Sequence, residues 1–119
     1  MISKELLEIV LSDWTIFEVI GIENNELIIR GNKPNTMSFT GMESININEL
    51  ADMCQNKVSE LEFDLFSYKG RVSKKWYTEI IKQGWINSAE IRFYYGKFEM
   101  DTLPESKIKA CQWILDNQK

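Results

Sequence analysis

The chain has 119 residues, of which 44% are hydrophobic and 27% are charged, the balance typical of a globular protein. This length and composition predict one domain over residues 1–119, and they exclude a disordered tail or a disulfide scaffold. The formal net charge is −4, and the sequence contains no histidine. Without histidine, the Ser-His-Asp and Cys-His nucleophile systems are excluded. We therefore expect a protein that is not an enzyme and needs no cofactor.

The two cysteines, Cys54 and Cys111, do not form a CxxC pair, which argues against a zinc or thioredoxin-like site. Both lie in segments with periodic apolar residues, so we expect buried thiols rather than a disulfide. The first residues lack the basic and apolar stretches of a signal peptide, and the apolar runs are too short to span a membrane. These features favour a cytoplasmic protein without a membrane partner.

The N-terminal part predicts a helix followed by a β-hairpin. Ser3 can cap a helix whose apolar residues recur at helical spacing as far as Trp14. Residues 15–22 are rich in β-branched and aromatic side chains and predict a strand, and residues 27–30 predict its returning partner. The asparagines in residues 23–26 tolerate the left-handed backbone of a tight hairpin turn.

The central part predicts a loop, a strand and a second helix. Residues 31–36 contain Gly, Asn and Pro and predict the loop, and residues 37–42 predict the third strand. Asn46 and Glu49 have the spacing of a capping box, so we expect a helix from Asn46 to about residue 56.

Residues 60–66 alternate between acidic and apolar side chains, as in a half-buried strand. On this interpretation Glu60, Glu62 and Asp64 form a ladder of carboxylates on one strand face. Same-face side chains on a strand are about 7 Å apart, too far for all three to chelate one small ion. We therefore expect this ladder to meet a basic partner rather than a metal ion.

After a polar loop around Gly70, residues 73–84 predict a third helix, capped by Ser73 and ended by Gly84. Residues 90–95 predict a further strand. Gly96 and Lys97 fit a type II′ turn, and the alternative is one long strand with a bulge at Gly96.

The last predicted element is a helix that begins near Pro104, because proline in the first turn loses no hydrogen bond. Thr102 and Glu105 have capping-box spacing just before it. The resulting order predicts an α+β fold, with about four helices and a mainly antiparallel sheet of four to five strands.

Charge is unevenly distributed along the chain. Residues 5–26 and 43–64 are strongly acidic, whereas residues 69–82 are mainly basic. The acidic stretches are either solvated faces or one face for a basic partner. Neighbouring tyrosines on a strand point to opposite faces, so at least one is available as an interface anchor. The candidate partner-binding residues are carboxylates and aromatic residues: Glu43, Asp52, Glu60, Glu62, Asp64, Tyr94 and Tyr95.

The segment 69–77 interleaves basic and aromatic side chains, a pattern that suits a nucleic-acid backbone with base stacking. A basic entry to a helix with Trp76 in the core explains the segment equally well. Because the stretch is short and the chain is acidic overall, the sequence disfavours a nucleic-acid partner.

Three features together resemble the small immunity proteins of contact-dependent growth inhibition and related bacterial toxin systems. They are the hairpin turn Ile22-Glu23-Asn24-Asn25-Glu26, the ladder Glu60-Glu62-Asp64, and the strand Ile91-Arg92-Phe93-Tyr94-Tyr95. The resemblance implies a cytoplasmic, non-enzymatic inhibitor that binds a cognate toxin domain, often a basic nuclease, and occludes its active site. The alternative is a small acidic secretion chaperone, which would differ in being a stable homodimer.

Overall fold

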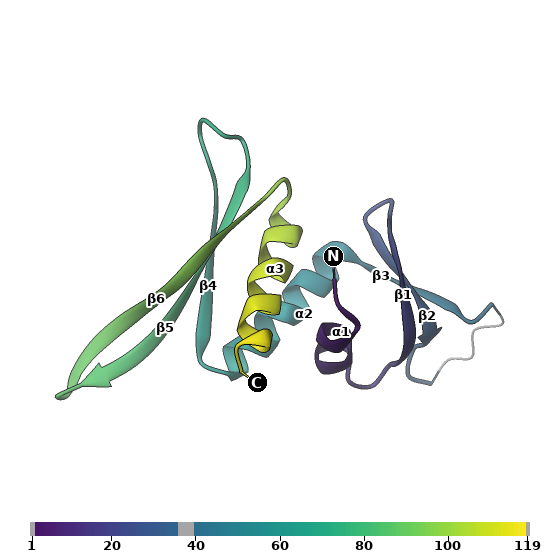
Figure 1. Ribbon diagram of the computed structural model, residues 1–119, viewed down its shortest axis with the longest axis horizontal. Coiled ribbons are helices and arrows are strands. Elements are labelled where there is room, and N and C mark those ends of the chain that lie inside the picture. The colour runs from purple at the N-terminus through teal and green to yellow at the C-terminus, as the bar shows by residue number, and fades with distance from the viewer. Residues whose placement is uncertain (1, 36–39, 119) are drawn as a thin grey trace. The chain divides into compact units, whose positions relative to one another are not determined.

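A computed structural model describes residues 2–35 and 40–118 of the chain. The α+β class predicted from the sequence is confirmed, with antiparallel strands and three helices among the described residues. The strands form two separate three-stranded sheets, however, so the prediction of one sheet with four to five strands is wrong. The chain divides into two compact units, residues 1–50 and 51–119 (Figure 1).

Unit 1 begins with a short helix and a β-hairpin, as predicted. Helix α1 spans Lys4–Val10, and the hydroxyl of Ser3 accepts a hydrogen bond from the Leu6 amide at 3.1 Å. Strands β1 (Thr15–Glu23) and β2 (Glu26–Asn32) pair antiparallel. Their turn uses Asn24 and Asn25, both with positive φ, as a two-residue hairpin turn requires.

The third strand of unit 1 differs from its prediction. Strand β3 spans Met42–Asn46 and pairs with β2, four to five residues later than the predicted strand 37–42. Residues 37–39 of that prediction lie outside the described residues, and Thr40 and Gly41 form a turn and bend. The apolar core of the unit comes from α1 and all three strands: Leu6, Leu7, Leu11, Ile16, Leu27, Ile29 and Ile45.

Helix α2 (Ile47–Glu60) begins where the sequence predicts and runs four residues further. The side-chain oxygen of Asn46 accepts hydrogen bonds from the amides of Asn48 and Glu49, at 2.9 and 3.3 Å, so the predicted cap is confirmed. The helix starts in unit 1 and ends in unit 2.

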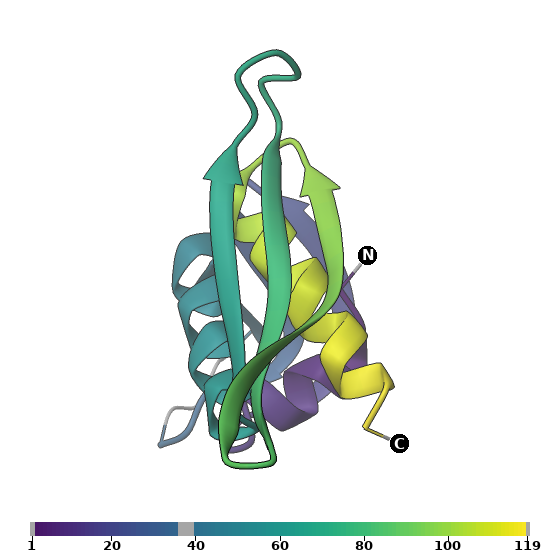
Figure 2. The same cartoon turned by 90° about the vertical axis from the view of Figure 1, so that its left-hand side faces the viewer.

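Unit 2 is a three-stranded antiparallel sheet with one face covered by a helix. Strands β4 (Phe63–Lys69), β5 (Trp76–Ile86) and β6 (Ala89–Met100) are ordered β4-β5-β6. Helix α3 (Leu103–Asp116) contacts all three strands, and Figure 2 shows it behind the sheet. The predicted cap of α3 is confirmed, because the Thr102 hydroxyl accepts from the Glu105 amide at 3.4 Å.

The predicted helix over residues 73–84 is wrong, because this segment supplies the central strand β5. Thr78 and Ile80 alternate with half-exposed neighbours and are fully buried beneath α3. Aromatic and β-branched residues of this kind fit a pleated surface with neighbours on both sides. The tertiary pairing with β4 and β6 therefore decides the structure of the segment.

Strand β6 is continuous through Gly96, so the bulge is correct and the turn at Gly96 and Lys97 is not. Ile80 pairs with Gly96 and Ile81 pairs with Tyr94, which leaves Tyr95 as the extra residue. The hairpin turn of β5 and β6 instead uses Asn87 and Ser88, both with positive φ.

Two polar contacts hold α3 in place. A chain of hydroxyls runs from the sheet to the helix, with 2.8 Å between Ser67 and Thr78 and 2.8 Å between Thr78 and Ser106. The two cysteines are buried and free, as predicted, and Cys111 Sγ donates to the Cys54 carbonyl at 3.6 Å. The neighbouring Cys111 side chain, together with burial, raises the pKa of the Cys54 thiol well above its ordinary value.

Candidate interaction surfaces

The predicted carboxylate ladder does not exist as a strand face. Glu60 is the last residue of α2 and pairs with Lys57 at 3.4 Å, while Glu62 lies in the following turn with a φ of +68°. Only Asp64 belongs to a strand, β4. The alternation of residues 60–66 gave the wrong strand start because it continues, by coincidence, through the end of a helix and its turn.

The other predicted residues are distributed over different surfaces. Asp64 and Tyr94 lie in one cross-strand row, on either side of Ile81, so the structure brings these two together. Glu43 pairs with Lys33 at 3.8 Å, and Asp52 pairs with Lys107 at 3.8 Å. Each of these carboxylates therefore has a partner within its own unit.

Tyr94 and Tyr95 point to opposite sides of the sheet, as their adjacency predicts. Tyr94 is 60% exposed on the side away from α3. Tyr95, the bulge residue, packs against Phe63 at 5.7 Å and against Trp113 of α3 at 6.2 Å, measured between ring centroids. Tyr94 is therefore the one available to a partner on the open side.

The side of the β4-β5-β6 sheet opposite α3 faces the viewer in Figure 2, and we call it the open sheet face. Its side chains follow from the strand register and include six apolar or aromatic residues: Phe66, Tyr68, Tyr77, Ile81, Trp85 and Tyr94. Tyr68 and Tyr77 pair directly across β4 and β5, and their rings stack at 5.4 Å with an angle of 19°. Phe66 continues the row at 5.8 Å from Tyr68 and is 57% exposed.

Charged side chains contact the stacked pair Tyr68 and Tyr77. The Tyr68 hydroxyl donates to Glu79 at 3.3 Å. Partial desolvation, with the negative charge of Glu79, raises the pKa of Tyr68. The cation of Lys97 lies over the Tyr77 ring at 5.2 Å.

A basic loop closes one end of the open sheet face. It connects β4 to β5 and extends beyond the strand ends in Figure 2. Counted from Lys69, the last residue of β4, it carries four cations: Lys69, Arg71, Lys74 and Lys75. Its backbone is ordered by hydrogen bonds from the Gly70 amide to the Lys75 carbonyl, at 2.8 Å, and from the Lys74 amide to the Gly70 carbonyl, at 3.2 Å.

A second surface lies in unit 1, where β1 is the edge strand of its sheet. Two register shifts in the pairing with β2 leave Phe17 and Ile20 without a paired residue. These side chains and Ile22 are 62%, 43% and 54% exposed. Glu18 follows Phe17 and Glu23 follows Ile22, so this β1 edge combines apolar anchors with carboxylates.

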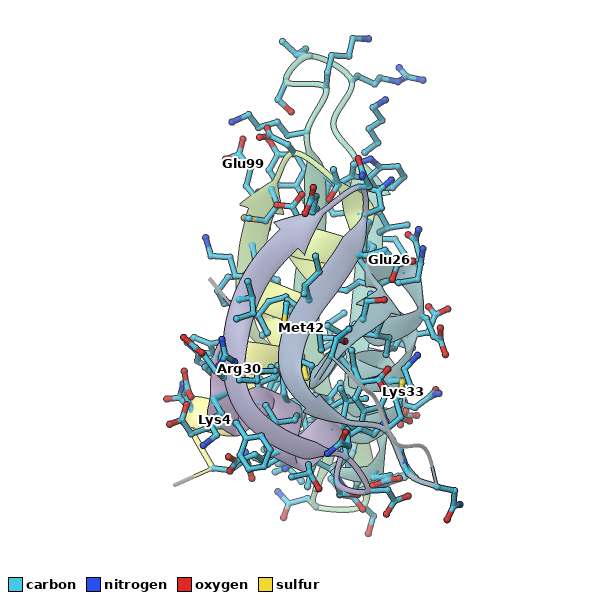
Figure 3. The ribbon with its side chains drawn as sticks, turned by 90° about the vertical axis from the view of Figure 1, so that its right-hand side faces the viewer. Lys4, Glu26, Arg30, Lys33, Met42 and Glu99 are labelled. Atoms are coloured by element: carbon cyan, nitrogen blue, oxygen red, sulfur yellow. The ribbon has the colours of Figure 1, made fainter. Side chains whose placement is uncertain are left out.

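Beside the β1 edge, the outer face of the unit 1 sheet is hollowed. Figure 3 looks onto this face, where Arg30 and Met42 lie on neighbouring strands. Arg30 is held by Glu18, with 3.5 Å between Nε and Oε2. The hollow has a volume of about 380 Å³ and is lined by Phe17, Arg30, Gly31, Asn32, Thr40, Gly41 and Met42. Phe17 therefore belongs both to the edge and to a concave surface.

Over residues 2–35 and 40–118, no group of three or more acidic or cysteine side chains is arranged to hold a metal ion. Within the same residues, no helix has the length and apolar character needed to cross a membrane.

Sequence reasoning missed both surfaces for identifiable reasons. Predicting residues 73–84 as a helix placed Tyr77 and Ile81 in a core, which hid the open sheet face. The hairpin prediction was correct, but the exposure of Phe17 and Ile20 depends on bulges that no local signal marks. The large apolar residues of β1 fall on both faces of the strand, at Ile16 and Phe17 and at Val19 and Ile20, and this pattern was the available sign of an uncovered edge.

Comparison with family models, with curated proteins and with solved structures gave no match for this chain.

Proposed function

We propose that this protein is a non-enzymatic inhibitor of the immunity type, of the kind found in contact-dependent growth inhibition. On this proposal it acts in the bacterial cytoplasm, where it binds one cognate toxin domain of basic, nuclease-like character and covers its active site. The observation that carries the proposal is the β1 edge, where exposed apolar anchors lie next to carboxylates.

The charge distribution supports a basic partner for unit 1. Residues 1–50 contain eight acidic and three basic residues, a net charge of −5, whereas residues 51–119 contain ten acidic and eleven basic residues. An acidic unit accelerates encounter with a basic domain and orients it before contact. The acidic surface is thus concentrated in the unit that also carries the exposed edge.

The edge geometry supports tight contact after encounter. A large aromatic anchor in the centre of an interface contributes much of the binding energy, and Phe17 is the most exposed large apolar side chain among the described residues of unit 1. The outward backbone groups of an edge strand can also pair with a strand of the partner. Binding there would exclude solvent from Phe17 and bring Glu23 close to basic residues of the partner.

The test begins with native mass spectrometry of the tagged chain purified from its own cytoplasm, to identify the bound protein. That protein is then expressed alone, and its affinity for the chain and its inhibition are measured by titration calorimetry and an activity assay. The variant Phe17→Ala with Ile22→Ala should weaken binding about 30-fold or more, the effect of losing one strong anchor.

The matched control is Phe66→Ala with Trp85→Ala, which removes two equally exposed apolar side chains from unit 2. This control should bind within about twofold of the unaltered chain, and both variants should keep their circular dichroism spectra. Loss of binding in the control but not in the β1 variant would refute the assignment. A stable homodimer carrying an unfolded client would instead favour the chaperone alternative.

A further inference from the structure

The basic loop, residues 69–75, carries a concentrated positive charge, most of which is not balanced by ion pairs. Its four cations are all exposed. Lys75 pairs with Asp101 at 3.8 Å, whereas Lys69, Arg71 and Lys74 make no ion pair with any described residue. Three cations are therefore available to an anionic ligand.

The loop is physically continuous with the aromatic row of the open sheet face. The Tyr77 hydroxyl donates to Ser73 Oγ at 2.9 Å, which ties the loop to the ring. A Cβ atom at Gly70 would lie 2.8 Å from Tyr77 Cε2, so the loop backbone packs directly on this ring. From the loop, the row continues through Tyr77 and Tyr68 to the exposed ring of Phe66.

We propose that this surface binds single-stranded nucleic acid, with the phosphates on the basic loop and the bases on the aromatic row. Single-strand sites combine a positive track for the backbone with aromatic side chains on which successive bases stack. Here Arg71 and Lys74 supply the charge, and Phe66 supplies an exposed ring at the end of the aromatic row.

Two observations favour a nucleic acid over an acidic protein segment. An acidic peptide would neutralise the loop, but it has no general use for a row of stacked rings, whereas every base has a face that stacks. The overall acidity of the chain, which argued against nucleic acid, also comes entirely from unit 1, since residues 51–119 carry a net charge of +1. The site is thus independent of the β1 edge and of the function proposed for it.

The test is fluorescence anisotropy with labelled ten-nucleotide oligo(dT) and oligo(U), using the full chain. Binding should weaken about 20- to 50-fold between 50 and 200 mM salt, as expected for three to four phosphate contacts on a single strand. The variant Arg71→Ala with Lys74→Ala should weaken binding at least tenfold and flatten this salt dependence. Phe66→Ala should weaken it about fivefold or more through lost stacking.

Matched controls are Lys109→Ala, an exposed cation on α3, and Phe17→Ala, an exposed aromatic residue of unit 1. Both should bind like the unaltered chain. The proposal is overturned if no oligonucleotide binds with 100 µM protein at 50 mM salt, or if a duplex binds as tightly as the single strand.

The nucleic-acid proposal is also overturned if polyglutamate displaces the labelled oligonucleotide as well as unlabelled oligonucleotide does. That result would indicate an acidic protein partner. The Phe17→Ala, Ile22→Ala variant should bind oligonucleotide normally, so failure here can be distinguished from failure of the proposed inhibitor function.

Discussion

A methyl group added at Gly31 would strain the pairing of β1 and β2 in unit 1. Gly31 pairs with Ile16, and a Cβ atom there would lie within 2 Å of the Thr15 carbonyl oxygen, which is backbone and cannot rotate away. Gly31→Ala should therefore destabilise the protein by about 2 kcal/mol or more, measured by urea unfolding. Gly21→Ala on the partner strand is the control, because nothing lies within 4 Å of its Cβ position, and it should have little effect. Equal stability of the two variants would contradict this prediction.

Single residues with a local role were predicted well from the sequence. The caps at Ser3, Asn46 and Thr102 are confirmed, because a capping side chain bonds to amides only two or three residues away. The Asn24-Asn25 turn is confirmed for the same reason. The role of Gly31 could not be predicted, since the atom that forbids its side chain is 16 residues away in sequence.

At the scale of elements, β5 shows where periodicity fails. Trp76, Tyr77, Ile80 and Ile81 fit an apolar helical stripe, yet they also fit a central strand whose two faces are both partly covered. The strand is formed because β4 and β6 pair along its two edges, an arrangement of residues distant in sequence. The helix predicted for this segment also misled the functional interpretation. It concealed that Tyr77 lies on a sheet face, and it placed the basic segment before a helix instead of at the end of a sheet.

The hydroxyl chain under α3 should be a strong determinant of how this helix is held on the sheet. Ser106 donates to the Leu103 carbonyl at 2.8 Å, so Ser106 accepts from Thr78, and Thr78 in turn accepts from Ser67. Thr78→Val keeps the shape but removes one donor and one acceptor at a fully buried position. We expect a loss of about 1 to 3 kcal/mol in the free energy of unfolding, measured by urea titration. Ser67→Ala, at the half-buried end of the chain, should cost less, and the reverse order would contradict the role given to Thr78.

At the scale of the whole molecule, the sequence predicted the fold class and the existence of opposite charges along the chain. It could not predict that the strands divide between two sheets, because strand partners are chosen by long-range packing. This division changes the functional interpretation: the net charge of −4 is the sum of an acidic unit and a nearly neutral one that carries a basic loop. The structure therefore has no acidic ladder over residues 60–64. It has instead two separate surfaces of different charge, the β1 edge and the open sheet face with its basic loop.

Helix α2 gives a reason to expect that the two units unfold together, although each has its own sheet. It is one unbroken helix, and it contributes buried residues to both units, Leu50 before the division and Cys54 and Val58 after it. Unfolding either unit removes the packing of part of this helix, and a short remaining piece is marginally stable by itself. Hydrogen–deuterium exchange should then show that Gly31→Ala lowers protection of β5 as well as β2, and that Thr78→Val does the same in reverse. Loss of protection confined to the unit that carries the substitution would show that residues 1–50 and 51–119 are independent domains.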